Sequence, residues 1–250
     1  MSSVAISLIV FACVFGGVLL GMFLRTALPQ EHVSADSKGA VNLGIGMIGT
    51  MAALVLGLLV ASAWSFYSTQ KDELTLVSAK FVMLDRLLAH YGPEAKDTRA
   101  MLRSDVNALL DRMWPGERPT HTLGVPNSGA EGLYDEIQNL SPQNDIQRSI
   151  KAAALGAAME IGNARWLMFE QETFPVPKKL LIVVVFWFTV VFASFGLHAP
   201  RNTTVMVTLL LCALSVAGAM LMILELYNPF GGLVHISSAP LRSALAQLGK

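Results

Sequence analysis

Residue types that could carry out chemistry are spread thinly along this sequence, at spacings that known chemistries do not use. No Gly-Lys-Ser/Thr loop, Gly-x-Ser-x-Gly elbow or His-Glu-x-x-His pair occurs. We therefore predict no catalytic residue, no cofactor site and no metal site, and a protein that is not an enzyme. The isolated histidines and cysteines fit this view, since both cysteines lie in apolar runs and the histidines stand singly (Cys13, Cys212, His32, His90, His121, His198 and His235).

Glycines and other small residues form the most regular pattern in the chain. Gly44 to Gly49 spells Gly-x-Gly-x-x-Gly, but it opens an apolar helix and no strand precedes it, so we assign no dinucleotide site. Small residues then recur at every fourth position, beside one threonine (Gly49, Ala53, Gly57, Ala61 and Ser65, with Thr50). Such a row lets helix backbones approach closely in lipid. It indicates either packing within one subunit, together with Gly17 and Gly21, or a subunit interface or pore wall.

The composition places much of the chain in a membrane. Of its 250 residues 53% are apolar and 14% are charged, and the mean hydropathy is +0.52. Soluble domains carry about 25% charged residues. Lys plus Arg equals Asp plus Glu, at 18 each, so no charge excess favours a nucleic-acid partner.

Four uncharged apolar windows are long enough to cross the ~30 Å of hydrocarbon, which takes about 20 helical residues. They are 4–24, 43–66, 180–197 and 205–224. Because backbone polar groups in lipid must be satisfied internally, we predict helices. The predicted fold is therefore an all-α membrane protein with four transmembrane helices and a helical bundle inserted between the second and third.

Charges flanking the windows predict the orientation. Basic residues are concentrated on the side of the large loop, which the positive-inside rule makes cytoplasmic, whereas Arg25 after the first window favours the opposite arrangement. We expect transmembrane helices 1 and 2 in residues 1–67, a cytoplasmic helical domain in 68–179, helices 3 and 4 in 180–226 and a cytoplasmic tail in 227–250. Both termini would then be cytoplasmic, in a protein of the cytoplasmic membrane.

The inserted domain shows helical periodicity. Apolar residues at spacings of three and four predict that the second transmembrane helix continues, without a breaker, to Gly92-Pro93 (Leu74, Val77, Phe81, Leu84, Leu88 and Tyr91). A return helix from Glu94 to Trp114 has an apolar face as well (Thr98, Leu102, Val106, Leu109 and Met113). We expect a short helix near 131–140, then a long one beginning at Ser141-Pro142 with its own face (Ile146, Ile150, Ala153, Ala157, Ile161, Ala164 and Met168).

An acidic residue, Glu225, ends the fourth window. An acid at membrane depth is a functional candidate, although at a helix end its carboxylate can reach water. The segment that follows contains a turn-forming Pro-Phe-x-Gly and a Ser-x-x-Pro-Leu, in which Ser238 would cap a short amphipathic helix (Glu225, Pro229, Phe230, Gly232, Ser237, Pro240 and Leu241).

This tail resembles the signature of the bestrophin-like domain family, although Leu-Tyr-Asn stands between the acid and the proline where fewer residues are expected. The whole chain is also similar to that family in its order of two spans, a helical insert and two more spans. Bestrophins are pentameric anion channels with the second span lining the pore. The resemblance implies a homo-oligomer, a pentamer in the bestrophin manner, in contact with the lipid bilayer and small ions.

The leading hypothesis from the sequence is a homo-oligomeric ion channel for small anions, with the second transmembrane helix near the central axis. The alternative is a non-conducting scaffold or accessory subunit that recruits a partner through its cytoplasmic helices. An ion-coupled transporter fits less well, because the spans contain no charges and no matching broken helices.

Overall fold

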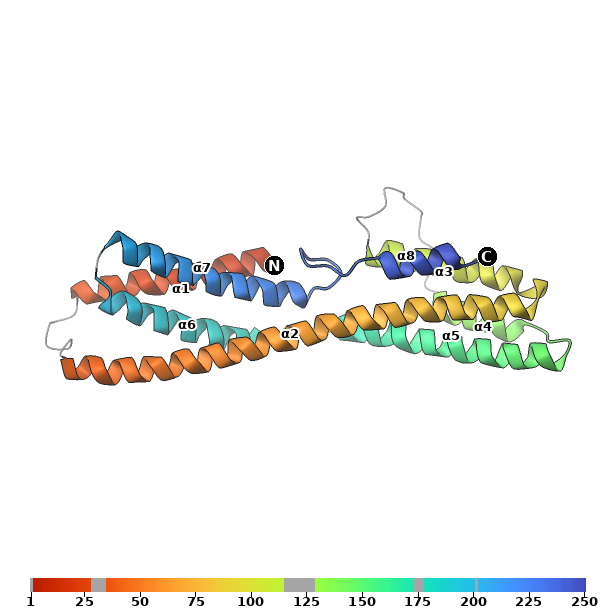
Figure 1. The fold of residues 1–250 in the computed structure, drawn as a ribbon, viewed down its shortest axis with the longest axis horizontal. Helices are drawn as coiled ribbons and strands as arrows, with labels where there is room; N and C mark the ends of the chain where they lie inside the picture. Colours follow the sequence, from red (N-terminus) through yellow and green to blue (C-terminus); the bar gives the residue numbers. More distant parts are fainter. Residues whose placement is uncertain (1, 28–34, 115–128, 173–177, 201) are drawn as a thin grey trace. The chain divides into compact units, whose positions relative to one another are not determined.

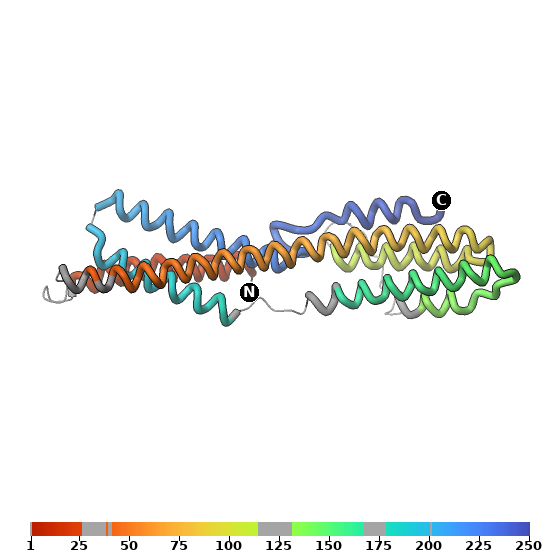
Figure 2. The backbone as a smooth tube through the Cα atoms, turned by 60° about the horizontal axis from the view of Figure 1, so that its bottom comes forward, coloured from red at the N-terminus to blue at the C-terminus, as the bar shows by residue number. Residues whose placement is uncertain are grey.

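The computed structural model describes residues 2–27, 35–114, 129–172, 178–200 and 202–250, and these are helical almost throughout. Figures 1 and 2 follow the chain from end to end. The helices are α1 (Ser3–Ala27), α2 (Ala35–Tyr91), a 3-10 turn (Pro93–Ala95), α3 (Lys96–Met113), α4 (Gly129–Asn139), α5 (Asp145–Glu172), α6 (Lys178–His198), α7 (Thr203–Leu226) and α8 (Ala239–Gln247). The described residues confirm the predicted all-α class.

The chain divides into two compact units. The first holds residues 1–67, 175–228 and 232–234, and the second holds 68–174, 229–231 and 235–250. Four helices are long and apolar enough to cross a membrane, and they contain the four predicted windows (Ser3–Thr26, Asn42–Tyr91, Lys179–His198 and Thr203–Leu226). At 1.5 Å per residue the 50 residues from Asn42 extend about 75 Å, so only the apolar part can lie in ~30 Å of hydrocarbon.

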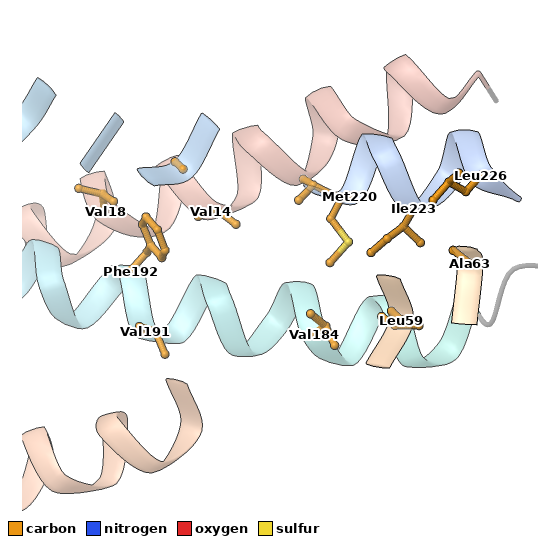
Figure 3. Packing of buried hydrophobic residues seen from close by; sticks show 12 residues of the cluster. Val14, Val18, Leu59, Ala63, Val184, Val191, Phe192, Met220, Ile223 and Leu226 are labelled. Atoms are coloured by element: carbon orange, nitrogen blue, oxygen red, sulfur yellow. The ribbon is translucent and has the colours of Figure 1, made fainter. Parts of the chain in front are cut away.

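The first unit packs α1 against α6 and α7 around an apolar core (Figures 1 and 2). Figure 3 shows side chains from α1, α2, α6 and α7 converging in this core (Val14, Val18, Leu59, Ala63, Val184, Val191, Phe192, Met220, Ile223 and Leu226). The Arg25 guanidinium donates to the Ala199 carbonyl, which brings the C-terminal end of α1 beside that of α6. If the four spans alternate in direction, the first and third run parallel, and this arrangement agrees with that order.

Glycines allow α1 and α6 to approach at backbone distance. A Cβ added at Gly17 would lie 2.7 Å from the Thr189 carbonyl oxygen. One added at Gly21 would overlap the Ala193 carbonyl, and one at Gly196 would overlap the Val18 carbonyl. Because lipid supplies no hydrophobic force between helices, such close van der Waals packing is what holds this pair together.

The second unit contains the C-terminal part of α2 with α3, α4, α5 and α8. The predicted α2 seam is confirmed, since its apolar residues are buried (Leu74, Val77, Phe81, Leu84, Leu88 and Tyr91). The helix ends at Tyr91, as predicted. Gly92 has a φ of 129°, which favours glycine, and Pro93 starts the next turn.

Details of α3 and α5 in the second unit differ from the sequence predictions. On α3 the buried face includes Leu110 rather than Leu109. On α5 the interior residues are Ala154 and Ile161, whereas Ile146 is 73% exposed and Ala153 is exposed. Neighbouring positions on a helix are about 100° apart. An error of one residue in a face read from spacing therefore changes which side chains are buried.

The start of α5 also differs. It begins at Asp145, three residues after the predicted proline, and the Asn144 side chain accepts the Gln147 N–H at 2.8 Å. This bond is the usual one for a helix N-cap, and asparagine serves there as well as serine. Pro115, Pro175 and Pro177, which would break the neighbouring helices, lie outside the described residues, as does the basic Arg201.

Candidate pore face and tail motif

The predicted row of small residues lies on a face of α2 that the described part of the subunit leaves open. Thr50, Ala53, Gly57, Ala61 and Ser65 are exposed, and Gly49 is half-buried. A Cβ added at Gly49 or Gly57 would meet nothing within 4 Å. The structure thus separates this row from Gly17 and Gly21, which the sequence grouped with it.

Helix α2 is also the least buried of the four candidate spans. Its most apolar window has 11% of its residues buried inside the subunit, against 33%, 22% and 28% for α1, α6 and α7. The buried residues of its spanning part are Ala52, Leu59 and Ala63, on a face other than that of the small residues. Packing against the described residues of one subunit therefore does not explain the row.

Hydroxyl groups along α2 are used in two ways. Thr50 Oγ1 donates to the Met47 carbonyl at 2.8 Å, a bond within its own helix that any helical threonine can make. Ser62 Oγ lies 3.1 Å from the Tyr227 hydroxyl at the end of α7. The Tyr227 ring also packs on Phe66, with ring centroids 5.4 Å apart. This contact joins α2 to the start of the tail.

Glu225 is buried within the subunit. It is 5% exposed, and its carboxylate accepts the backbone N–H of Leu233. A Cβ added at Gly232 would overlap the same carboxylate. The acid and the glycine of the tail motif therefore close one loop, in which the backbone N–H replaces the water that the carboxylate would otherwise bind.

The middle of the motif belongs to the second unit. Pro229 is buried, and its carbonyl accepts the Ile236 N–H at 2.7 Å. The Phe230 ring meets Trp114 edge-on at 5.7 Å, and the Trp114 indole N–H donates to the Ile236 carbonyl at 2.9 Å. A T-shaped ring pair and a satisfied indole N–H are both favourable. The tail is thereby attached to the end of α3.

The end of the motif forms α8. Leu241 is fully buried, and Pro240 occupies the first turn, as predicted. The predicted cap is wrong, because Ser238 makes no side-chain capping bond and instead accepts a hydrogen bond from Arg242 Nε at 2.9 Å. The exposed Ser237 accepts the Ala239 N–H at 3.2 Å.

Among the described residues of the second unit, two acidic side chains are buried. Asp85 receives two hydrogen bonds from Arg99, at 2.8 and 2.9 Å, and one from the Gly249 N–H at 3.2 Å. Burial alone would raise the pKa of Asp85, but these bonds and the Arg99 charge hold it below its ordinary value. Burial raises the pKa of Asp105 to about 6, against the opposing charge of Arg165.

The described residues contain no group of three His, Cys, Asp or Glu side chains placed to hold a metal ion. The two features of interest are the open face of α2 and the tail, which contacts Ser62 through Tyr227 and Trp114 through Phe230.

Comparison with known proteins identifies the family. The family described as bestrophin-like domain matches residues 12–241. The chain belongs to the bestrophin-like domain family. The tail resemblance seen in the sequence is thereby confirmed.

Solved structures agree with this assignment in fold. A point mutant of a bacterial bestrophin homologue from Klebsiella pneumoniae has a TM-score of 0.65 and 14% identity, covering 94% of this bestrophin-like chain and 97% of that one. The same homologue phased by Zn-SAD has a TM-score of 0.64, 15% identity and coverages of 93% and 96%. A variant of a membrane protein in which a proline is replaced by alanine has a TM-score of 0.67 and 13% identity, covering 99% of this chain and 98% of that one. A search of curated proteins gives no match.

Sequence reasoning missed several residues that the structure brings together in this bestrophin-like chain. Tyr227 contacts Ser62 and Phe230 contacts Trp114, and no local sequence pattern indicates either contact. Asp85 and Arg99 gave no signal beyond their position on opposite sides of a hairpin. Tyr227 is one of the three residues between Glu225 and Pro229, where the family signature has fewer, and this longer stretch is the one sequence signal for it.

Proposed function

We propose that this protein is the subunit of a homo-oligomeric membrane ion channel, in which α2 lies near the central axis. The observation that carries the proposal is the open face of α2. A row of small residues that the described part of its own subunit leaves largely exposed suits close approach by a second α2 or the water of a pore. The family and the fold of the bestrophin homologues support this reading.

We further propose small anions as the permeant species and a pentamer as the assembly. The family resemblance supports both. The face offers no acidic side chain from Leu43 to Phe66, whereas cation pathways use rings of acids. An apolar wall of this kind would gate by dewetting. The basic residues near the large loop support a cytoplasmic placement of both termini and of residues 68–179.

The test is ion flux in liposomes. Purified protein is reconstituted with a chloride-sensitive dye inside, and chloride entry is compared with empty liposomes and with liposomes containing the Gly57→Leu variant. The proposal predicts chloride entry only with wild-type protein. No flux from a correctly folded oligomer, for chloride or for any monovalent cation, would contradict it.

A second candidate, a non-conducting scaffold, is favoured by one observation. Apolar side chains of the second unit are exposed although the charges around them place that unit in water (Leu76 54%, Met83 60%, Ile146 73% and Met159 56%). Affinity purification from native membranes decides it. Recovery of a stoichiometric partner that requires Met83 and Met159, from a protein without flux, would favour the scaffold.

A further inference from the structure

The contact between Tyr227 and Ser62 gives the tail motif a role that cannot be predicted from its sequence. All parts of this contact lie within the first unit. The helix concerned, α2, is loosely packed there, because Ala52 is its one buried residue between Leu43 and Leu58 and the other residues of this stretch that pack on the core are only partly buried (Ile45, Ile48, Val55 and Leu56). The contacts that bury α2 more fully lie nearer its Leu59–Phe66 segment.

Those contacts come from the end of α7. Leu59 and Ala63 lie in the same apolar cluster as Ile223 and Leu226 (Figure 3). Apolar contacts of this kind are not directional, so they permit a helix to rotate or slide. A hydrogen bond is directional and fixes the rotation. Ser62 supplies it, one residue from Ala61 of the open face.

The partner hydroxyl is itself held in place. Tyr227 follows the last turn of α7, and its N–H bonds to the Ile223 carbonyl at 3.2 Å. Its ring packs against Phe66. Two residues earlier, the buried Glu225 carboxylate accepts the Leu233 N–H and closes the loop that leaves Tyr227. The fold of the loop thus determines where the phenol points.

We infer that Tyr227 is a positioning residue, which sets the rotation of α2 through its hydroxyl bond to Ser62 and is itself positioned by the Glu225–Leu233 loop closure. The inference rests on the proposed channel function. If the open face of α2 lines the axis, the bond biases the equilibrium between conducting and closed arrangements without touching the ion. The residue then changes how often the channel is open and leaves the conductance of an open channel unchanged.

The experiment is a double-mutant cycle in the full-length oligomer, recorded from single channels in planar bilayers. Tyr227→Phe keeps the ring on Phe66 and removes the hydroxyl, Ser62→Ala removes the other partner, and Ser62→Thr keeps a hydroxyl. A hydrogen bond contributes about 0.5–1.5 kcal/mol, so each removal should change the open probability about two- to tenfold at constant unitary conductance. The double variant should change the open probability no further than either single variant. Ser62→Thr, which keeps a hydroxyl, should have the wild-type open probability.

The matched control is Ser215→Ala. Ser215 also lies on a spanning helix, but its hydroxyl donates to the Leu211 carbonyl of its own helix at 2.9 Å. Open probability should stay at the wild-type value in this variant. Independent effects of Tyr227→Phe and Ser62→Ala that multiply in the double variant would overturn the inference, as would a change in unitary conductance.

A second measurement separates this inference from the proposed function. Hydrogen–deuterium exchange of the peptide covering residues 59–66 reports the ordering of α2 whether or not ions pass. Exchange that rises equally in Tyr227→Phe, Ser62→Ala and the double variant supports the positioning role even if wild-type protein carries no flux. Unchanged exchange in all three overturns it.

Discussion

Glycines in two regions of the first unit meet opposite surroundings. Gly21 on α1 and Gly196 on α6 lie against the backbone of the other helix, so that no Cβ can be accommodated. A Cβ added at Gly49 or Gly57 on α2 would meet nothing within 4 Å. The residue type is the same and so is the apolar setting. The comparison teaches that small residues in a span permit a close approach, and that the structure shows whether the described part of the same subunit supplies the partner.

The largest effect should come from filling the α1–α6 contact. Gly21→Ala places a Cβ on the Ala193 carbonyl, so the two helices must separate along their length. Overpacking of this kind costs about 3 kcal/mol, and more where backbone must move. Unfolding in detergent titrated with SDS should show the loss. If this variant is as stable as the wild-type protein, the contrast between the packed α1–α6 glycines and the open α2 face is refuted.

A larger residue on the open face should have a different effect. Gly57→Leu should leave the stability of the subunit within about 0.5 kcal/mol, because the described residues offer the new side chain no obstacle. Flux or oligomer recovery should nevertheless fall about tenfold or more, as judged by liposome assays and native mass spectrometry.

The matched control for this variant is Gly218→Leu on α7. Gly218 is exposed and a Cβ there also meets nothing within 4 Å, but it belongs to no small-residue row. Wild-type flux and assembly are expected. Equal losses in Gly57→Leu and Gly218→Leu would mean that the α2 face has no special role.

The smallest effect concerns pH, to which the row of small residues on α2 should not respond, because residues 43–66 contain no Asp, Glu, His, Lys or Arg. The second unit should respond through Asp105, whose pKa of about 6 in the folded protein exceeds the ordinary aspartate value near 3.9. Because the folded state binds the proton more tightly, stability should rise as the pH falls. The gain from pH 7.5 to 5 is about 1.4 kcal/mol, or roughly 3–6 °C in Tm.

Thermal melts in detergent at the two pH values measure this gain, with Asp105→Asn as the comparison. The amide does not titrate, so the gain should disappear in the variant. If the wild-type protein loses as much stability between pH 7.5 and 5 as Asp105→Asn does, the raised pKa of Asp105 is refuted.

Simple physical constraints made much of the fold predictable. The thickness of the bilayer determined the four spans, and the Gly92-Pro93 pair determined the end of α2. The exposure of Ile146 and the non-capping role of Ser238 could not be predicted, because single-residue rotations and competing partners such as Arg242 are settled by packing.

The candidate site was predictable only as a pattern. Spacing identified the row from Gly49 to Ser65, but whether it faces inward depends on where α1, α6 and α7 lie. Tyr227 reaches Ser62 across 165 residues of sequence, and no local pattern reports such a pair. The tail motif was recognisable by resemblance, while its contacts required three dimensions.

The most direct test of the central claim is chemical modification of Ala61→Cys from the aqueous phase. Cys13 and Cys212 are first replaced by Ala, because both thiols are exposed on the subunit. The account predicts that a charged, membrane-impermeant thiosulfonate reagent reacts with Ala61→Cys in liposomes and blocks its chloride flux, whereas Leu8→Cys on α1 keeps its flux. An Ala61→Cys channel whose flux is unaffected by the reagent would contradict the claim that this face lines the ion path.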